Sequence, residues 1–313
     1  MKAARIAGAL LALTFAGYAT AHTIHASSGT WTTIDDPNGP THTFVSGINA
    51  GGDMVGGYAD SGGVDHGFLF HNGTYTTLND PNAGKGASLG TLSYGINARG
   101  DIVGPYFDGS DVAHGYLLHN GTYTTLDDPA AGTGSGQGTY ANSISASGGI
   151  IDGWYVDAGN VSHGFVLRKG VYTTIDDPKA GTGSGQGTVV DSLAPNGDTL
   201  GAYYDNNNVF HGFMVHKGVY TTLDDPNAGT GSGQGTFVEG NPARGEIPGN
   251  YVDSNNLNHG FLLHKGVYTT LDDPHAGTGS GQGTMLTGVN ASGNVCGLYF
   301  DSHGFEHGLL YTP

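Results

Sequence analysis

The feature that most constrains the fold of this chain is an internal repeat of about 48 residues. A Thr-Thr-(Ile/Leu) segment followed by Asp/Asn-Asp-Pro recurs with the same period as a His-Gly-aromatic tripeptide. That tripeptide begins at His66, His114, His163, His211 and His259, and a His-Gly-Leu variant begins at His307. These starting points are 48, 49, 48, 48 and 48 residues apart. Self-similarity at such a period predicts six copies of one supersecondary unit.

Each copy contains four short strand candidates. In the second copy they cover residues 91–97, 102–108, 114–119 and 122–126. Asn120-Gly121 separates the last two, and both residues tolerate the positive φ of a tight hairpin. No segment has helical periodicity. The pattern predicts an all-β fold over residues 30–313, a six-bladed β-propeller of four-stranded blades, and is matched less well by an open β-solenoid.

The two ends of the repeat region are complementary. The first copy is preceded by a lone strand candidate, Thr30–Ile34, and the last copy ends at Tyr311 without the matching fourth strand. We therefore expect the N-terminal strand to complete the last blade and close the ring, which would leave no open sheet edge.

The charge of the chain excludes some partners. The formal net charge is −17, and 58 of the 313 residues are glycine, which fits short strands joined by glycine turns. Because a protein this acidic repels nucleic acid and anionic lipid, we expect neither as a partner. Cys296 is the only cysteine and cannot form an internal disulfide.

The N-terminus has the pattern of a secretory signal peptide. Lys2 and Arg5 precede a short apolar stretch, and Ala19-Thr20-Ala21 is a small-x-small cleavage site. We assign residues 1–21 to a signal peptide and residues 22–29 to an N-terminal lead, which predicts a secreted or periplasmic protein. No second long apolar run follows, so we expect no membrane insertion, and we expect a monomer.

A third repeated block carries a family resemblance. The segments GINAGGDMVGGY at Gly47 and GINARGDIVGPY at Gly95 return in altered form in the other copies. With the His-small-Phe-Leu segment that follows, the pattern resembles the bacterial extracellular repeats known as the HAF family, over nearly the whole chain after residue 29. Gly67 and its equivalents replace the alanine usual in that family. The resemblance implies secretion and repeat architecture, and it implies no particular activity.

Acidic residues gather in two sets of loops predicted to share one face. The simpler interpretation is that Asp-Asp-Pro and the Asp/Asn runs form turns, because these side chains hydrogen-bond to nearby backbone. The alternative is calcium, which prefers such oxygen ligands, although the spacing of known calcium loops is absent. The candidate calcium ligands are Asp108, Asp157, Asp205 and Asp253.

Positions at which the copies differ are the candidates for a unique site, because identical copies cannot supply groups with different roles. One innermost-strand position forms a polar ring at the mouth of the predicted channel: Ser46, Tyr94, Asn142, Asp191, Glu239 and Thr287. We take Tyr94, Asn142, Asp191 and Glu239 as candidate ligand-binding residues. Asp191 and Glu239 are also weak catalytic candidates, since paired carboxyl groups can share a proton or hydrolyse a glycosidic bond. The alternative is a wet channel position that varies freely.

The third copy differs in a second way. Asp152 and Trp154 occupy positions that are apolar or small in most other copies. A one-residue insertion near Gly149 and Ile150 predicts a β-bulge. Trp154 is a further candidate ligand-binding residue, as a platform on which a sugar ring could stack, with core filling as the alternative.

These observations favour a non-enzymatic extracellular binding or surface module, with repeated pockets on the acidic face and a glycan or a protein as ligand. The alternatives are a glycoside hydrolase or lyase with a carboxylate pair at the channel mouth, and a calcium-stabilised structural protein. No cofactor is expected apart from calcium in the last case.

Overall fold

A computed structural model describes residues 29–194, 197–240 and 242–313. The predicted signal peptide and residues 22–28 of the lead lie outside the described residues. The described residues contain strands and turns and no helix, which confirms the all-β prediction. Within them, no helix is long and apolar enough to cross a membrane.

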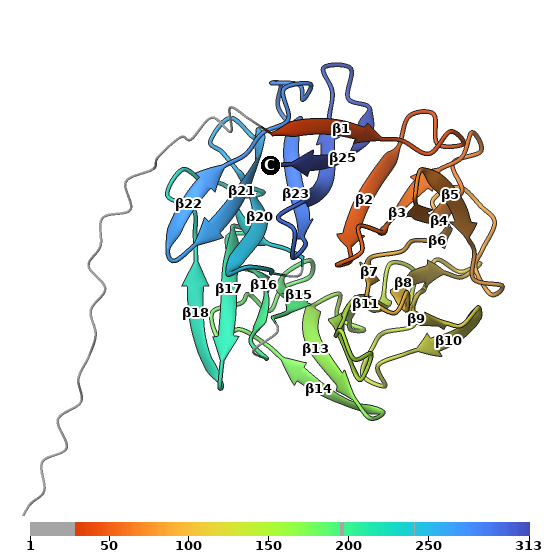
Figure 1. Ribbon diagram of the computed structural model, residues 1–313. Helices are drawn as coiled ribbons and strands as arrows, with labels where there is room; N and C mark the ends of the chain where they lie inside the picture. Colours follow the sequence, from red (N-terminus) through yellow and green to blue (C-terminus); the bar gives the residue numbers. More distant parts are fainter. Residues whose placement is uncertain (1–28, 195–196, 241) are drawn as a thin grey trace, which may run out of the picture.

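The strands pair in antiparallel groups that follow one another around a central axis (Figure 1). Group 1 comprises β2 (Thr43–Ile48), β3 (Met54–Ala59), β4 (Asp65–His71) and β5 (Thr74–Leu78). Group 2 comprises β6 (Gly90–Thr91), β7 (Gly95–Ile96), β8 (Ile102–Phe107), β9 (Ala113–His119) and β10 (Thr122–Leu126). Group 3 comprises β11 (Gly138–Ile144), β12 (Ile150–Val156), β13 (Ser162–Arg168) and β14 (Val171–Ile175).

The remaining groups repeat this order. Group 4 comprises β15 (Gly187–Leu193), β16 (Thr199–Tyr204), β17 (Phe210–His216) and β18 (Val219–Leu223). Group 5 comprises β19 (Gly235–Val238), β20 (Glu246–Val252), β21 (Asn258–His264) and β22 (Val267–Thr270). Group 6 comprises β23 (Gly283–Val289), β24 (Val295–Phe300), β25 (Glu306–Thr312) and β1 (Thr30–Ile34).

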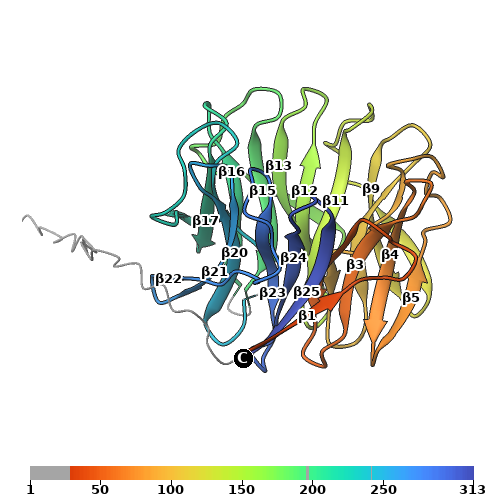
Figure 2. The same ribbon diagram turned by 90° about the horizontal axis from the view of Figure 1, so that it is seen from above.

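The N-terminal strand joins the two ends of the chain. β1 pairs antiparallel with β25, from Thr30 opposite Thr312 to Ile34 opposite Gly308, and Figure 2 shows the two strands side by side. This confirms the predicted pairing. A bridge between His42 and Glu306 then links group 6 to group 1, so the sheet is nearly closed.

The core lies between neighbouring groups. One cluster joins Val55 of group 1 to Ile96, Ile102 and Tyr116 of group 2. The His-Gly-aromatic motif is explained by this packing, because its aromatic residue is fully buried while its glycine faces the next group. A Cβ on Gly115 would lie 2.7 Å from the Leu126 carbonyl oxygen and 3.3 Å from the Ala141 Cβ. Such close approach leaves no room for a side chain.

The one-residue insertion of the third copy lies in a turn. The Ser145 amide donates to the Ile150 carbonyl, whereas the equivalent Asn97 amide donates to Asp101, one residue nearer in sequence. The pairing of β12 with β13 is regular from Ile150 onward. The bulge predicted near Gly149 and Ile150 is therefore wrong, because a turn exposed to solvent absorbs an extra residue without disturbing the ladder.

Candidate functional site

A cavity of about 380 Å³ opens among the innermost strands. It brings together the five predicted ligand-binding residues, and Ser46 and Thr287 of the same ring also line it. Ser162, the first residue of β13, and Gly185, in the loop that precedes β15, line it too, so it opens toward the side of the molecule on which the acidic loops lie. The predicted ligand-binding residues in its wall are Tyr94, Asn142, Trp154, Asp191 and Glu239.

The ring side chains reach the cavity because they lie at irregularities in the inner strands. The register of the first two strands of groups 1, 3, 4 and 6 shifts across Ser46, Asn142, Asp191 and Thr287 respectively. In group 2 the inner strand is interrupted before Tyr94, and in group 5 it ends just before Glu239. A bulge leaves one residue unpaired and redirects its side chain. The sequence analysis did not foresee this regular feature.

Three ring residues also bind the neighbouring group. The Ser46 hydroxyl donates to the Ser93 carbonyl at 2.6 Å, and the Thr287 hydroxyl donates to the Val45 carbonyl at 2.9 Å. The Asn142 amide donates to Asp191 Oδ1 at 2.6 Å. Ser46 and Thr287 therefore join neighbouring groups, whereas Asn142 orients a carboxyl group.

Aromatic rings form one wall of the cavity. Trp154 is stacked on Tyr140 with ring centroids 4.7 Å apart and planes 4° apart. The Tyr94 ring is nearly parallel to Trp154 at 6.5 Å, with an interplanar angle of 13°. Trp154 thus packs within the wall while remaining partly exposed. Trp154 fills space between groups 2 and 3 and presents its remaining surface to the cavity, and its role as a platform for a sugar ring stays a prediction.

Three carboxyl groups lie at or under the cavity. Asp191 and Glu239 line it, and their enclosure by protein, which hinders hydration of the charged forms, raises the pKa of both. The Asp191 charge raises the pKa of Glu239 further, whereas the hydrogen bond from Asn142 favours ionised Asp191. Asp152, opposite Ser143 on β11, has no surface exposure.

Asp152 is the most unusual of the three. Burial, with the nearby Asp191 charge, raises its pKa to about 8, and only the Ser143 hydroxyl opposes that shift. Neither of its oxygens makes a well-formed hydrogen bond within the described part of the chain. The raised pKa favours the protonated form of Asp152 at neutral pH.

Two further carboxyl groups near the cavity were not singled out from the sequence. Burial raises the pKa of Glu306 to about 7, and the charge of Asp65 adds to the shift. Burial also raises the pKa of Asp65. Both charges act on Tyr94, so they lie near the wall of the cavity. Asp65 is the first residue of β4 in group 1, and Glu306 is the first residue of β25 in group 6. These two groups become neighbours only when the ring closes. No local pattern in the sequence indicated this meeting.

The candidate calcium ligands take part in turns. Oδ1 of Asp108, for example, accepts hydrogen bonds from the amides of Ser110 and Val112 at 2.8 and 3.0 Å. In the same way, Oδ1 of Asp157, Asp205 and Asp253 each accepts hydrogen bonds from the backbone amides two and four residues later in the chain. Among the described residues no group of three or more His, Cys, Asp or Glu could hold a metal ion.

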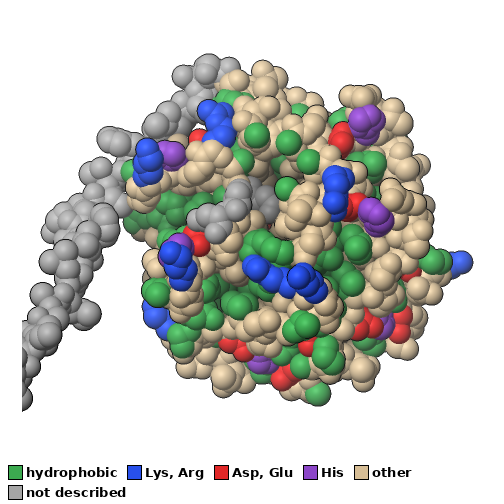
Figure 3. Space-filling view, turned by 60° about the horizontal axis from the view of Figure 1, so that its bottom comes forward, with side chains coloured by type: hydrophobic (Ala, Val, Ile, Leu, Met, Phe, Trp, Pro, Cys, Tyr) green, Lys and Arg blue, Asp and Glu red, His purple; other side chains and the backbone are tan. Residues whose placement is uncertain are grey.

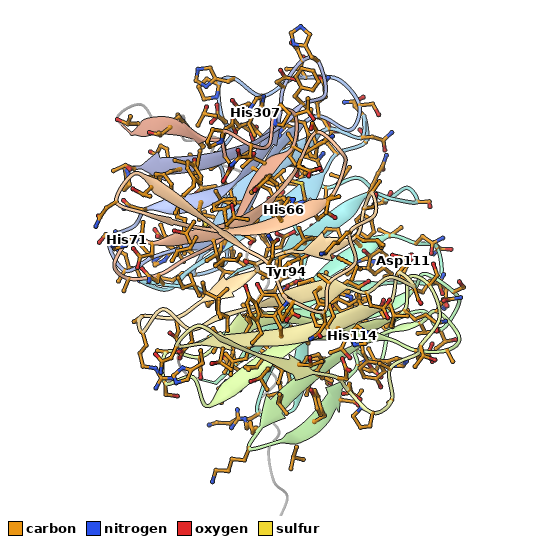
Figure 4. The ribbon with its side chains drawn as sticks, turned by 90° about the vertical axis from the view of Figure 1, so that its right-hand side faces the viewer. His66, His71, Tyr94, Asp111, His114 and His307 are labelled. Carbon is orange, nitrogen blue, oxygen red and sulfur yellow. The ribbon has the colours of Figure 1, made fainter. Side chains whose placement is uncertain are left out.

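The repeated histidines are structural. In each copy the ring stacks on a tyrosine, as His114 does on Tyr106 at 4.9 Å, and its Nδ1 bonds to an acidic or amide side chain of the loop leading to the next group. Asp127 fills this role for His114, and Asp35 does so for His307 across the closure. Figure 4 labels three of these histidines, His66, His114 and His307, on successive parts of the ring. The repeated histidine thus ties each group to the loop that leads to the next one.

A second cavity of about 510 Å³ lies at the opposite end of the channel, and Ile48 lines both cavities. It is lined largely by small and aliphatic residues, such as Ala50, Ile96 and Ala291. Figure 3 shows one face of the molecule, where Lys and Arg side chains lie around hydrophobic side chains near the centre. This second cavity has none of the carboxyl groups described above.

Comparisons with known proteins bear on the fold alone. No protein-family model and no curated protein matches this chain. Among solved structures, AofleA from Arthrobotrys oligospora is similar with a TM-score of 0.53 and 10% identity over 93% of this chain and 89% of that chain. The fucose-specific lectin from Aleuria aurantia has a TM-score of 0.46 and 11% identity, covering 87% and 98% of the two chains. TolB from Acinetobacter baumannii has a TM-score of 0.48 and 12% identity, covering 79% and 59%.

Proposed function

We propose that the chain is a six-bladed β-propeller, each antiparallel group being one blade, and that it acts as a carbohydrate-binding module. The observation that carries the function is the cavity, in which a stacked aromatic wall faces hydrogen-bonding side chains. Trp154 and Tyr94 supply the aromatic surface, and Asn142, Asp191 and Glu239 supply polar groups. A sugar ring offers apolar C–H faces and a rim of hydroxyl groups, and this combination satisfies both kinds of surface.

The proposal places one principal site in each molecule. The repeated pockets expected on the acidic face would need free polar groups there, whereas those histidines and aspartates are bonded to each other and to the backbone. The volume of about 380 Å³ lies within the range of small-molecule sites and suits one or two sugar units.

The location of the protein is part of the proposal. The signal-peptide pattern of residues 1–21 and the resemblance to HAF repeats favour a protein that works in the periplasm or outside the cell. Extracellular glycans are available in either place.

The test is binding of the protein lacking residues 1–21 to a glycan array, followed by titration calorimetry with each hit. We expect a stoichiometry near one ligand per chain and loss of binding in Trp154→Ala. The matched control is Trp31→Ala, which removes the other tryptophan, on β1 away from the cavity. A stoichiometry near six, or binding that survives Trp154→Ala, would contradict the assignment to this cavity.

A second candidate is glycoside hydrolysis, favoured by the carboxyl pair. A general acid must hold its proton at working pH, and the raised pKa of Glu239 meets that need while Asp191 lies nearby to act as base or nucleophile. Release of reducing sugar from a bound glycan, abolished by Glu239→Gln with binding retained, would support catalysis. Intact glycan after prolonged incubation would leave binding alone.

A further inference from the structure

The cavity has an excess of acidic groups with no basic partner. Asp191 and Glu239 line it, the charge of Asp191 acts on the buried Asp152, and no Lys or Arg is among the described residues of its wall. Asp65 and Glu306 act on Tyr94 of the same wall, and the other titratable groups near Asp191 and Glu239 are tyrosines. Burial, together with the charges of Asp191 and Glu239, raises the pKa of Tyr204 on β16 to about 12, and the Asp191 charge also reaches Tyr94.

Asp152 adds a third, buried acidic side chain whose pKa responds to the charge of Asp191. Its side chain is fully buried, lacks a well-formed hydrogen bond and interacts with Asp191. Buried polar groups without partners are rare in native proteins and call for an explanation. Equivalent positions in groups 1 and 2 hold Val55 and Val103, so packing alone does not require an acid there.

The aromatic lining suits the same kind of ligand. Phe44, Tyr94, Trp154, Tyr204 and Phe237 all contribute to the wall. The faces of aromatic rings attract cations, most strongly where water is excluded, and cages of such rings beside carboxyl groups hold ammonium ligands. A neutral sugar would use the rings and hydrogen bonds but would leave the acidic excess uncompensated.

We propose that the cavity selects a saccharide carrying a free ammonium group, such as a glucosamine unit, with Asp191 and Glu239 pairing with the ammonium. This inference rests on the proposed carbohydrate-binding function and specifies its ligand class. The ammonium replaces the proton that the carboxyl pair otherwise shares, so binding releases protons to solvent.

The surroundings of the cavity favour the approach of a cation. The acidic loops lie on the side on which it opens, since Ser162 and Gly185 belong to that side. The lysine of one such loop, Lys179, is bonded to Thr222 of an outer strand. In Figure 4, Asp111 of these loops and His71 lie toward opposite edges of the ring, with Tyr94 between them. A mouth of one charge sign concentrates ligands of the opposite sign.

The experiment compares matched ligands by calorimetry. Glucosamine dimers and trimers are titrated beside the corresponding N-acetylated oligomers and glucose oligomers, and choline is titrated beside its uncharged analogue 3,3-dimethyl-1-butanol. We expect the free-amine oligomer to bind at least about tenfold more tightly than either neutral oligomer, as a charged hydrogen bond confers. The released protons are taken up by the buffer. The measured binding enthalpy near pH 7 should therefore differ between buffers of different ionisation enthalpy.

The variants test the assigned residues. Asp191→Asn and Glu239→Gln keep the shape of the side chains. In both variants the ratio of the affinity for the amino oligomer to that for the neutral oligomer should fall close to one, and fewer protons should be released on binding. Glu246→Gln, at the start of β20 away from the cavity, is the control. It should keep both the preference for the amino oligomer and the release of protons. Circular dichroism and the unfolding midpoint establish that each variant is folded.

The outcomes separate the two proposals. Equal binding of neutral and amino oligomers would refute selection of the ammonium group and leave carbohydrate binding standing. Binding of choline without any sugar would refute carbohydrate binding, and with it the saccharide class of ligand, while sparing the cation site. No binding by any probe would refute both.

Discussion

Asp152 should make the stability of this protein depend on pH in a way that a single substitution can remove. Its pKa is raised from 3.8 to about 8 by burial and by the Asp191 charge. Between these values the folded state holds a proton that the unfolded state has lost. Stability contributed by this group is therefore complete below pH 3.8 and declines as the pH rises toward 8.

The size of the effect follows from the shift. At pH 7 the interval above the unfolded pKa of 3.8 is 7 − 3.8 = 3.2 pH units. At 1.36 kcal/mol per unit, this is on the order of 4 kcal/mol. Asp152→Asn has nearly the same shape and no proton to exchange. Its unfolding free energy relative to the unchanged protein should therefore rise by about that amount between pH 4 and pH 7.

The assay is urea unfolding followed by intrinsic fluorescence at pH 4, 5.5 and 7. Comparing the change with pH cancels any constant cost of placing an amide at this site. Val171→Ala, which changes an exposed side chain with no titratable group, is the control, and its difference from the unchanged protein should stay level. The reasoning is refuted if Asp152→Asn and the unchanged protein lose stability in parallel from pH 4 to pH 7.

Three further outcomes follow from the structure. Trp31→Ala removes the ring that packs against Tyr311 at 4.7 Å across the closure, so it should lower the unfolding free energy by about 3 kcal/mol, measured by urea unfolding; an unchanged midpoint would mean that β1 contributes little. Asp157→Ala removes two hydrogen bonds to loop amides and should cost about 1–3 kcal/mol, with faster amide exchange at residues 157–161 as the local readout. Burial raises the thiol pKa of Cys296 to about 12, so iodoacetamide should modify it only after unfolding; rapid modification of the native protein would contradict its burial.

Much of the fold could be predicted from the sequence because its signals are local and are repeated. Asn120-Gly121 requires two positive φ values, and the structure has φ of 49° and 77° there. The strand ranges expected for the second copy agree with β8, β9 and β10 to within one residue. Repetition also made the exceptions visible, which is how Asp191, Glu239 and Trp154 were found.

Other features of the site depend on neighbours distant in sequence. The bulges that redirect Asn142 and Asp191 are defined by how the inner strand pairs with the next strand, and two consecutive polar residues at each, such as Asn142-Ser143, do not by themselves specify a bulge. The extra residue near Gly149 was assigned to a strand because the sequence does not show where the turn ends and the strand β12 begins. The burial of Asp152 against Asp191 arises from the packing of group 3 on group 4.

The sequence by itself determined the repeat, the strand and turn positions, the closing strand and the identity of the polar ring, because each is set by residues within one copy or by comparison between copies. Only the tertiary structure decided that the ring encloses a cavity, that Asp152 is fully buried and feels the charge of Asp191, and that the charges of Asp65 and Glu306 interact across the closure. Hydration and the distance between charges set these properties. Both depend on how the groups pack around the axis, and no single copy contains that information.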